Sequence, residues 1–294
     1  MIRNYLSLVK FSHTIFAMPF AMVGFTLAAF PGAVPYIERD RIWGLLIAVL
    51  VCMVTARSAA MAFNRWLDRH FDAQNPRTAI REIPAGIVSP EGALRFTLLM
   101  SAAFIVTTAF VNPLCLALSP VALAVVLGYS YTKRFTPLCH LVLGVGLSLA
   151  PIGAFLAVTG AFAFLPVLLS LAVLCWVSGF DIIYALQDVD FDRSQGLHSI
   201  PARLGVAGAL RVSRWLHALS AAFIGWAGLE GGFGPVFWVG AGLFGGMLVY
   251  QQSLVRPDDL SRINLAFMTA NGLASVVFGV LAIIDILHLI PWPV

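Results

Sequence analysis

Residues 42–78 read IWGLLIAVLVCMVTARSAAMAFNRWLDRHFDAQNPRT, an apolar run that ends in a cluster of charge. The apolar part contains one charged residue, Arg57, and it exceeds the ~20 residues that a helix needs to cross a bilayer. Two aspartates and three arginines then follow within residues 64–78. This stretch predicts a membrane-spanning helix that ends in a charged segment.

Apolar runs of the same kind recur along the whole chain. Of its 294 residues, 60% are hydrophobic and 11% are charged, whereas soluble domains average about 25% charged residues. Nine runs are long enough to span a membrane, at about 12–30, 43–63, 93–111, 114–132, 138–159, 163–182, 208–227, 234–254 and 264–288. The sequence therefore predicts an all-α, polytopic membrane protein with nine transmembrane helices, forming a single domain over residues 1–294.

Positive charge lies mostly on one side of this predicted topology. Of the 18 Lys and Arg residues, all except Arg39, Arg41 and Arg57 fall on the N-terminal segment, on the connections after the second, fourth, sixth and eighth spans, or near the start of the span that follows such a connection. The positive-inside rule makes that side, and with it the N-terminus, cytoplasmic. We expect a multi-pass protein of a bacterial inner (plasma) membrane or an organelle inner membrane, with no nucleic-acid ligand and no obligate protein partner.

Most acidic residues lie in the connections that follow the second and sixth spans, at about 64–92 and 181–207. In the first connection, Asn64, Asp68 and Asp72 are spaced by four, which places their side chains on one face of a helix. Arg57 lies seven residues earlier and close to the same face. Because an arginine inside a span is costly, it is a functional candidate.

The second connection carries a similar stripe. Asp181, Tyr184, Asp188 and Asp192 follow at steps of three, four and four, which again places them on one helical face. Asp190 points away from this face, so we leave it out of the predicted site. Tyr184 fits a ligand-binding role and an interfacial aromatic role equally well.

The two connections share a common frame. Asp68 and Asp188 are 120 residues apart, and so are Asp72 and Asp192. Each pair ends a predicted span, and the two spans are four spans apart. The pattern suggests an internal duplication of a four-helix unit with one extra helix.

Paired aspartates one helical turn apart are typical ligands of a hard divalent cation. Mg²⁺ usually takes one or two protein carboxylates and fills its remaining positions with waters and phosphate oxygens. Two facing pairs would hold Mg²⁺ ions around one diphosphate, and the membrane setting indicates a diphosphate with a lipid tail. The competing interpretation is a solvated helix end with weak surface ion pairs, and the repetition of the spacing disfavours it.

The sequence resembles the UbiA superfamily of intramembrane prenyltransferases over essentially its whole length. The segments that carry the resemblance are NRWLDRHFDAQNPRT (64–78), DIIYALQDVDFD (181–192), GLHSIPARLG (196–205), KFSHTIFAMPFA (10–21) and YSYTKRFT (129–136). The family often has Asn-Asp at the start of the first motif, whereas here Arg65 follows Asn64. The asparagine and both later aspartates are retained.

This resemblance implies a helical bundle around a central cavity, which the two motif loops cap on the cytoplasmic side. It implies that Mg²⁺, held by Asp68, Asp72, Asp188 and Asp192, binds polyprenyl diphosphate and assists the departure of diphosphate. The allylic cation then attacks an aromatic ring beside a hydroxyl group, and a base removes the ring proton. The expected acceptor is a hydroxylated aromatic acid such as 4-hydroxybenzoate, in the biosynthesis of ubiquinone or menaquinone.

Further residues are expected to complete this site. Asn64 would join the catalytic aspartates, and the diphosphate-binding candidates are Asn64, Arg77, Lys133, Asp181, Tyr184 and Arg203. Candidates for binding the carboxylate of the aromatic acid are Arg57, Arg134 and His13. Asn264 and Asn271, seven residues apart on the last span, are expected to form interhelical hydrogen bonds rather than to take part in catalysis.

Several alternatives remain open. A dihydroxynaphthoate prenyltransferase of the futalosine route to menaquinone would use the same residue types, so the sequence does not separate the two acceptors. A membrane transporter with a carboxylate ion site would carry its carboxylates near the midplane of the bilayer, whereas here they lie at helix ends. A CDP-alcohol phosphotransferase would need a D-G-x-x-A-R context, which the chain lacks.

Overall fold

The computed structural model describes residues 2–9, 16–30 and 39–288, and its regular elements within these ranges are all helical. They are α1 Ile2–Leu8, α2 Met18–Ala29, α3 Arg39–Leu67, α4 Arg69–Gln74, α5 Pro90–Ala109, α6 Pro113–Thr132, α7 Cys139–Thr159, α8 Phe164–Ala185, η2 Leu186–Asp188, α9 Val189–Ser194, α10 Ile200–Glu230, α11 Pro235–Leu254, η3 Leu265–Ala270 and α12 Asn271–His288. The predicted all-α class is confirmed.

Several of these helices have the length and composition of membrane spans. Within the described residues, six stretches are long and apolar enough: Arg41–Leu67, Pro90–Ala109, Pro113–Thr132, Cys139–Thr159, Phe164–Ser194 and Leu265–Leu287. Helix α2 is a shorter apolar helix, and α10 and α11 are not among these six stretches. The full number of nine spans therefore stays a prediction.

The sequence places clear start signals before three of the long helices. The side chains of Ser89, Asn112 and Ser199 each accept a hydrogen bond from a backbone N–H in the first turn of α5, α6 and α10. A proline follows each of them at the first or second helical position, where its missing N–H costs nothing. These caps fix where the helices enter the bundle.

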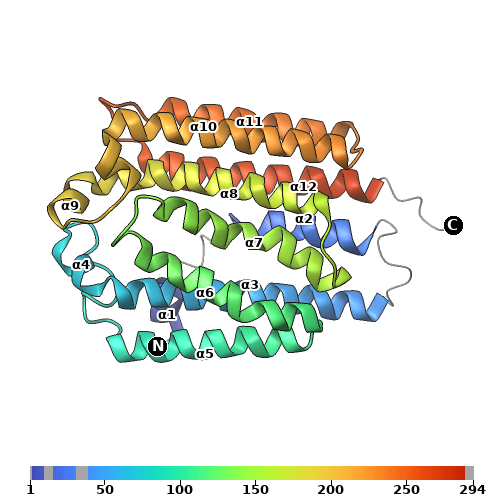
Figure 1. The fold of residues 1–294 in the computed structure, drawn as a ribbon, viewed down its shortest axis with the longest axis horizontal. Helices are drawn as coiled ribbons and strands as arrows, with labels where there is room; N and C mark the ends of the chain where they lie inside the picture. Colours follow the sequence, from blue (N-terminus) through green and yellow to red (C-terminus); the bar gives the residue numbers. More distant parts are fainter. Residues whose placement is uncertain (1, 10–15, 31–38, 289–294) are drawn as a thin grey trace.

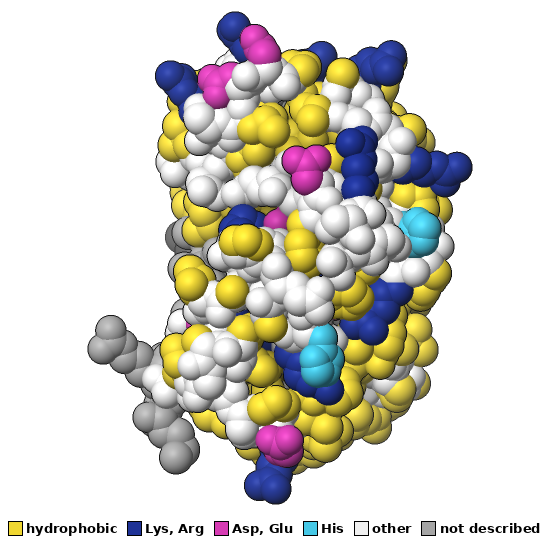
Figure 2. All heavy atoms as spheres, turned by 90° about the vertical axis from the view of Figure 1, so that its left-hand side faces the viewer, with side chains coloured by type: hydrophobic (Ala, Val, Ile, Leu, Met, Phe, Trp, Pro, Cys, Tyr) yellow, Lys and Arg dark blue, Asp and Glu magenta, His cyan; other side chains and the backbone are white. Residues whose placement is uncertain are grey.

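The long helices run side by side, and the chain passes back and forth between the two ends of the bundle (Figure 1). The segments that contain α4 and α9 lie together at the left-hand end in Figure 1, where α3 and α8 end and α5 and α10 begin. Lys and Arg side chains are spread over this end (Figure 2). The bundle therefore brings the two motif connections to one end, as the topology required.

Helix α8 lies in the centre of the bundle, packed against both α7 and α10. Its Trp176 is fully buried beside the rings of Phe20 in α2 and Phe244 in α11, and both of these rings contact Phe278 of α12. Neighbouring ring centroids in this group are 5.3 to 6.0 Å apart, within the range that favours aromatic contact. The aromatic cluster ties the last two helices to the middle of the molecule.

Close helix contacts depend on glycine at defined positions. A Cβ atom on Gly24 of α2 would lie 2.1 Å from the carbonyl oxygen of Pro151 in α7. A Cβ atom on Gly144 of α7 would lie 2.7 Å from the carbonyl oxygen of Leu174 in α8. Small residues let helix backbones approach in membranes, where packing drives association.

We predict that Gly24→Ala lowers the free energy of unfolding by ~1–3 kcal/mol, because the new methyl group must push α2 away from the backbone of α7. The measurement is thermal unfolding of the purified protein in detergent. Gly245→Ala in α11 is the matched control, since its Cβ atom meets no atom within 4 Å. Equal melting temperatures for the two variants would contradict the packing argument.

Candidate functional site

A cavity of about 450 Å³ opens between the two motif segments and extends into the bundle. Side chains from α3, α4, α6, α7, α8, α9, η3 and the loop after α4 line it. Charged and polar residues line the end near the motif segments. The apolar part of the lining includes Phe16, Met61, Leu143, Leu147, Val177, Phe180 and Phe267.

The first motif is helical but not continuous. Helix α3 ends at Leu67, Asp68 leaves helical geometry (φ −89°, ψ 5°), and α4 follows. The helical hydrogen bonds survive across this junction, because Asp68 N–H donates to Asn64 O at 2.9 Å and Asp72 N–H to Asp68 O at 2.8 Å. The spacing of four therefore still brings Asn64, Asp68 and Asp72 to the cavity wall.

The second motif repeats this construction. Asp188 also leaves helical geometry (φ −112°, ψ 9°), and the short helix α9 follows it, as α4 follows Asp68. The bounds of α4, Arg69–Gln74, shifted by 120 residues, are those of α9, Val189–Ser194. The local structure therefore agrees with the internal repeat that the aspartate spacing suggested.

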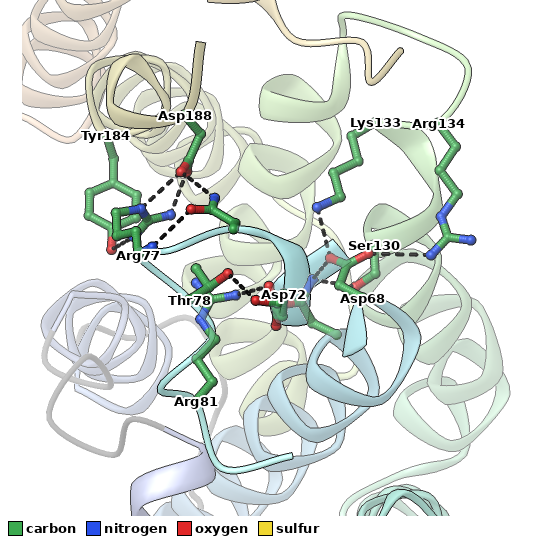
Figure 3. Close-up of polar contacts among 12 residues, drawn as sticks. Asp68, Asp72, Arg77, Thr78, Arg81, Ser130, Lys133, Arg134, Tyr184 and Asp188 are labelled. Atoms are coloured by element: carbon green, nitrogen blue, oxygen red, sulfur yellow. Dashed lines mark hydrogen bonds and ion pairs between the residues drawn. The ribbon is translucent and has the colours of Figure 1, made fainter. Parts of the chain in front are cut away.

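Asp68 is the most heavily neutralised carboxylate of the first motif (Figure 3). Lys133 Nζ lies 2.9 Å from its Oδ2, and Arg134 Nη2 lies 3.4 Å from its Oδ1. Asn64 Nδ2 donates to Asp68 Oδ2 at 3.1 Å and to Ser130 Oγ at 3.3 Å. Asp68 is only 2% exposed, so these partners offset the cost of burying its charge.

Asp72 is bound by the loop that follows α4. Arg81 Nη1 lies 2.7 Å from its Oδ1, and the hydroxyl of Thr78 donates to its backbone oxygen at 3.0 Å. The other carboxylate oxygen, Oδ2, is buried and has no hydrogen-bond partner within the described part of the chain. A buried carboxylate oxygen without a partner is an available ligand atom.

Asp188 connects the two motif segments. Arg77 donates from Nε to Asp188 Oδ1 at 2.9 Å and forms an ion pair with Oδ2, so both carboxylate oxygens are bound (Figure 3). Asn75 Nδ2 donates to the same Oδ1 at 2.9 Å, and Arg77 Nη1 donates to the hydroxyl of Tyr184 at 3.1 Å. Burial alone would lower the pKa of Arg77, but its contacts with Asp188 outweigh it and raise that pKa above its ordinary value.

Asp192 and Asp181 of the second motif contact a serine and a histidine rather than an arginine or a lysine. Asp192 Oδ2 accepts from the hydroxyl of Ser199 at 2.9 Å, and Asp181 Oδ2 lies 2.7 Å from His140 Nδ1. Both aspartates line the cavity. Asp190 is exposed and does not line it, which is the orientation that the helical stripe predicted.

The structure brings most of the predicted site residues to the same cavity. Those that line it are Arg57, Asn64, Asp68, Asp72, Arg77, Lys133, Asp181, Tyr184, Asp188 and Asp192. Arg134 does not line it and instead binds Asp68 and the backbone oxygen of Leu67. Arg203 is exposed on the first turn of α10, where Ser199 makes the contact with Asp192. His13 lies outside the described residues.

Sequence reasoning missed several polar residues of this site. Arg81 and Asn75 lie in the loop whose charge was noted, but no spacing rule connects them to Asp72 and Asp188. His140 lies at the start of an apolar span and carried no signal. Ser199 did carry a sequence signal, because a serine two residues before a proline is a typical start of a helix.

The available ligands are compatible with Mg²⁺ that binds together with a phosphate-bearing molecule. In the described ranges, no group of three or more His, Cys, Asp or Glu side chains lies close enough to hold a metal ion. Mg²⁺ commonly needs only one or two carboxylates when phosphate oxygens and waters supply the rest. The donors here are carboxylate oxygens, and the buried Oδ2 of Asp72 has no other partner.

Three comparisons with known proteins agree with one another. Residues 17–273 match the model of the UbiA prenyltransferase family. The 4-hydroxybenzoate octaprenyltransferase of Chromohalobacter salexigens is 31% identical over 241 residues, which cover 82% of this chain and 80% of that protein. The apo structure of a UbiA homolog from Aeropyrum pernix K1 is 36% identical, with a TM-score of 0.81, over 93% of this chain and 98% of that chain.

A more distant structure shares the fold alone. It is a UbiA homolog from Archaeoglobus fulgidus bound to DMAPP and Mg²⁺, 17% identical with a TM-score of 0.72, and the match covers 98% of this chain and 100% of that chain. The family match covers well over half of the chain, and its apolar helices suit a bilayer. The chain therefore belongs to the UbiA prenyltransferase family and is an integral membrane prenyltransferase.

Proposed function

We propose that the protein transfers a polyprenyl group from polyprenyl diphosphate to a hydroxylated aromatic acid, with Mg²⁺ as its cofactor. The observation that carries this proposal is a single cavity with two aspartate motifs at one end and apolar, partly aromatic walls at the other. A prenyl diphosphate has the same two parts, a multiply charged head and an apolar chain. The name of the 31% identical relative, 4-hydroxybenzoate octaprenyltransferase, supports the aromatic acceptor.

The charged end of the cavity would bind the diphosphate. Asp68, Asp72, Asp188 and Asp192 would hold Mg²⁺, which supplies Lewis-acid stabilisation of the departing diphosphate when bound. Arg77 and Lys133 bind Asp188 and Asp68 and line the same cavity, which supports a role for both cations in binding phosphate oxygens. Guanidinium and ammonium groups both suit phosphate oxygens, and Arg binds them in bidentate fashion. Asn64 and Tyr184 offer further hydrogen bonds, and Asp181 lines the same cavity.

In the chemical step the first prenyl carbon exchanges its bond to a diphosphate oxygen for a bond to a ring carbon. The bond between the first prenyl carbon and the diphosphate oxygen breaks, and the diphosphate leaves with the electron pair. The aromatic ring supplies the electron pair of the new carbon–carbon bond at a position beside its hydroxyl group, and the ring then loses the proton from that carbon. The apolar cavity wall excludes water, which would otherwise capture the allylic cation.

Arg57 is the strongest candidate for binding the carboxylate of the aromatic acid. It lines the cavity from within α3, and its Nε is buried without a hydrogen-bond partner among the described residues. Arg134 is a weaker candidate, because it already binds Asp68 and Leu67 O and lies outside the cavity lining. The relative's name favours 4-hydroxybenzoate over a dihydroxynaphthoate acceptor.

We further propose the membrane topology that the sequence predicts. Nine helices would cross the membrane, with the N-terminus and both motif segments on the cytoplasmic side. The positions of the motif segments at one end of the bundle and the Lys and Arg residues over that end support this orientation (Figure 2). The setting would be a bacterial inner membrane or an organelle inner membrane, in ubiquinone or menaquinone biosynthesis.

Removing one carboxylate from either motif should abolish turnover. We expect Asp68→Asn and Asp188→Asn each to lower kcat/KM by at least ~100-fold, because each removes a charged metal ligand. The assay measures diphosphate release and prenylated product from polyprenyl diphosphate, 4-hydroxybenzoate and Mg²⁺. Asp190→Asn is the matched control, since Asp190 is exposed in the same motif and should keep full activity. Full activity of a folded Asp68 or Asp188 variant would refute the metal assignment.

Substitutions of two cationic residues in the cavity should raise the KM values of different substrates. We expect Arg57→Gln to raise the KM for the aromatic acid by ~10-fold or more, because it removes a charge-assisted hydrogen bond to the carboxylate. Lys133→Gln should instead raise the KM for polyprenyl diphosphate. Both constants are measured for both variants at saturating co-substrate. If Arg57→Gln raises the two KM values equally, Arg57 belongs to the diphosphate site instead.

A further inference from the structure

The last transmembrane segment begins with an unusual turn. Residues of η3, Leu265–Ala270, form a π-helix that leads directly into α12. A π-helical turn is rare, because it widens the helix and displaces its hydrogen bonds, and it is frequent at functional sites. In this protein the turn borders the reaction cavity, since its Phe267 lines the cavity wall.

Three buried polar side chains hold this turn in place. Asn271 Nδ2 donates to the backbone oxygen of Phe267 at 2.8 Å, and Gln251 Nε2 donates to that of Ala266 at 2.8 Å. Trp176 Nε1 in turn donates to Asn271 Oδ1 at 2.8 Å. Trp176, Gln251 and Asn271 are all 0% exposed.

Such an arrangement is expensive in the apolar interior of a membrane protein. A regular α-helix satisfies its own backbone groups, whereas a buried amide needs partners to offset its desolvation. The sequence expectation of an interhelical bond is confirmed for Asn271, which links α12 to α8. Asn264, seven residues earlier, is exposed. The buried amide side chains of Asn271 and Gln251 therefore meet at the turn that carries Phe267.

Phe267 belongs to a group of four aromatic rings that line the cavity. Its ring centroid is 4.2 Å from that of Tyr184 and 5.5 Å from those of Phe16 and Phe180. The hydroxyl of Tyr184 accepts from Arg77, which in turn binds Asp188. Phe267 thus contacts Tyr184, one of the residues assigned to the diphosphate, on one side and the apolar lining residues Phe16 and Phe180 on the other.

We propose that Asn271 is a positioning residue that holds η3 so that the ring of Phe267 lies against the prenyl carbon that loses diphosphate. This inference rests on the proposed prenyl transfer. A ring face next to a carbocation stabilises it, and a ring at that place also keeps water away. With the ring in place the cation forms its bond to the aromatic acceptor. With the ring displaced, a water oxygen bonds to the same carbon and loses a proton, which gives the prenyl alcohol.

The test measures how each turnover ends. Full-length protein in lipid nanodiscs receives Mg²⁺, labelled polyprenyl diphosphate and 4-hydroxybenzoate, and the ratio of prenyl alcohol to prenylated acid is determined. This ratio does not depend on the fraction of folded protein, so loss of stability alone leaves it unchanged. Asn271→Leu and Phe267→Leu should each raise the ratio by roughly three- to tenfold, the range for losing one cation–aromatic contact.

Two further variants sharpen the test. If Asn271 acts through Phe267, the double variant Asn271→Leu/Phe267→Leu should show no more alcohol than Phe267→Leu alone. Trp176→Phe keeps a smaller aromatic ring in the core but lacks the N–H that binds Asn271, so it should shift the ratio in the same direction. Asn264→Leu, the same substitution at an exposed position of the segment, should leave the ratio at the wild-type value.

The possible failures are distinct from one another. Wild-type transfer with an unchanged ratio in Asn271→Leu, or additive effects in the double variant, would overturn the positioning role and leave the proposed function standing. A wild-type protein that forms no prenylated acid would overturn the proposed function and this inference with it. If Asn271→Leu fails to insert or fold, Trp176→Phe decides the question by the same ratio.

Discussion

The ion pair between Arg77 and Asp188 joins the two halves of the polar end of the bundle. Buried charges are tolerated only when partners replace the water they lose. Arg77 binds both oxygens of Asp188 and the hydroxyl of Tyr184, so one side chain of the first motif segment satisfies two side chains of the second. The cavity lies between these segments, and its shape depends on this contact.

Below that contact the cavity changes character over a short distance. Tyr184 binds the charged group of Arg77 through its hydroxyl, and its ring contacts Phe267, which belongs to the apolar part of the lining. The substrate of a membrane prenyltransferase has the same change of polarity, because it joins a charged diphosphate to a hydrocarbon chain. Hydrogen bonds from buried amide side chains hold η3, the π-helical turn that carries Phe267. This turn therefore lies where the cavity lining changes from polar to apolar.

Much of this arrangement could be read from the sequence, because it follows from helical periodicity. The spacing of Asn64, Asp68 and Asp72 predicted their common face. In the second motif, helical spacing correctly placed Asp190 outside the site. The identity of each carboxylate's partner could not be read in this way. It depends on the turn after α4, which brings Arg81 to Asp72 and Arg77 to Asp188, and no periodic rule covers an irregular loop. His140 gave no signal, since its contact with Asp181 joins two neighbouring helices, α7 and α8, whose register the sequence does not reveal.

The distance along the chain between Arg77 and Asp188 has a consequence for how the protein is made. The two residues are 111 positions apart, so synthesis and insertion of α5, α6, α7 and α8 must all precede their contact. A growing chain that has reached only α7 carries the first motif without the partner that completes it. The polar end of the bundle is therefore completed late in biogenesis, and a chain interrupted before η2 contains only Asp68 and Asp72 of the four aspartates proposed to hold Mg²⁺.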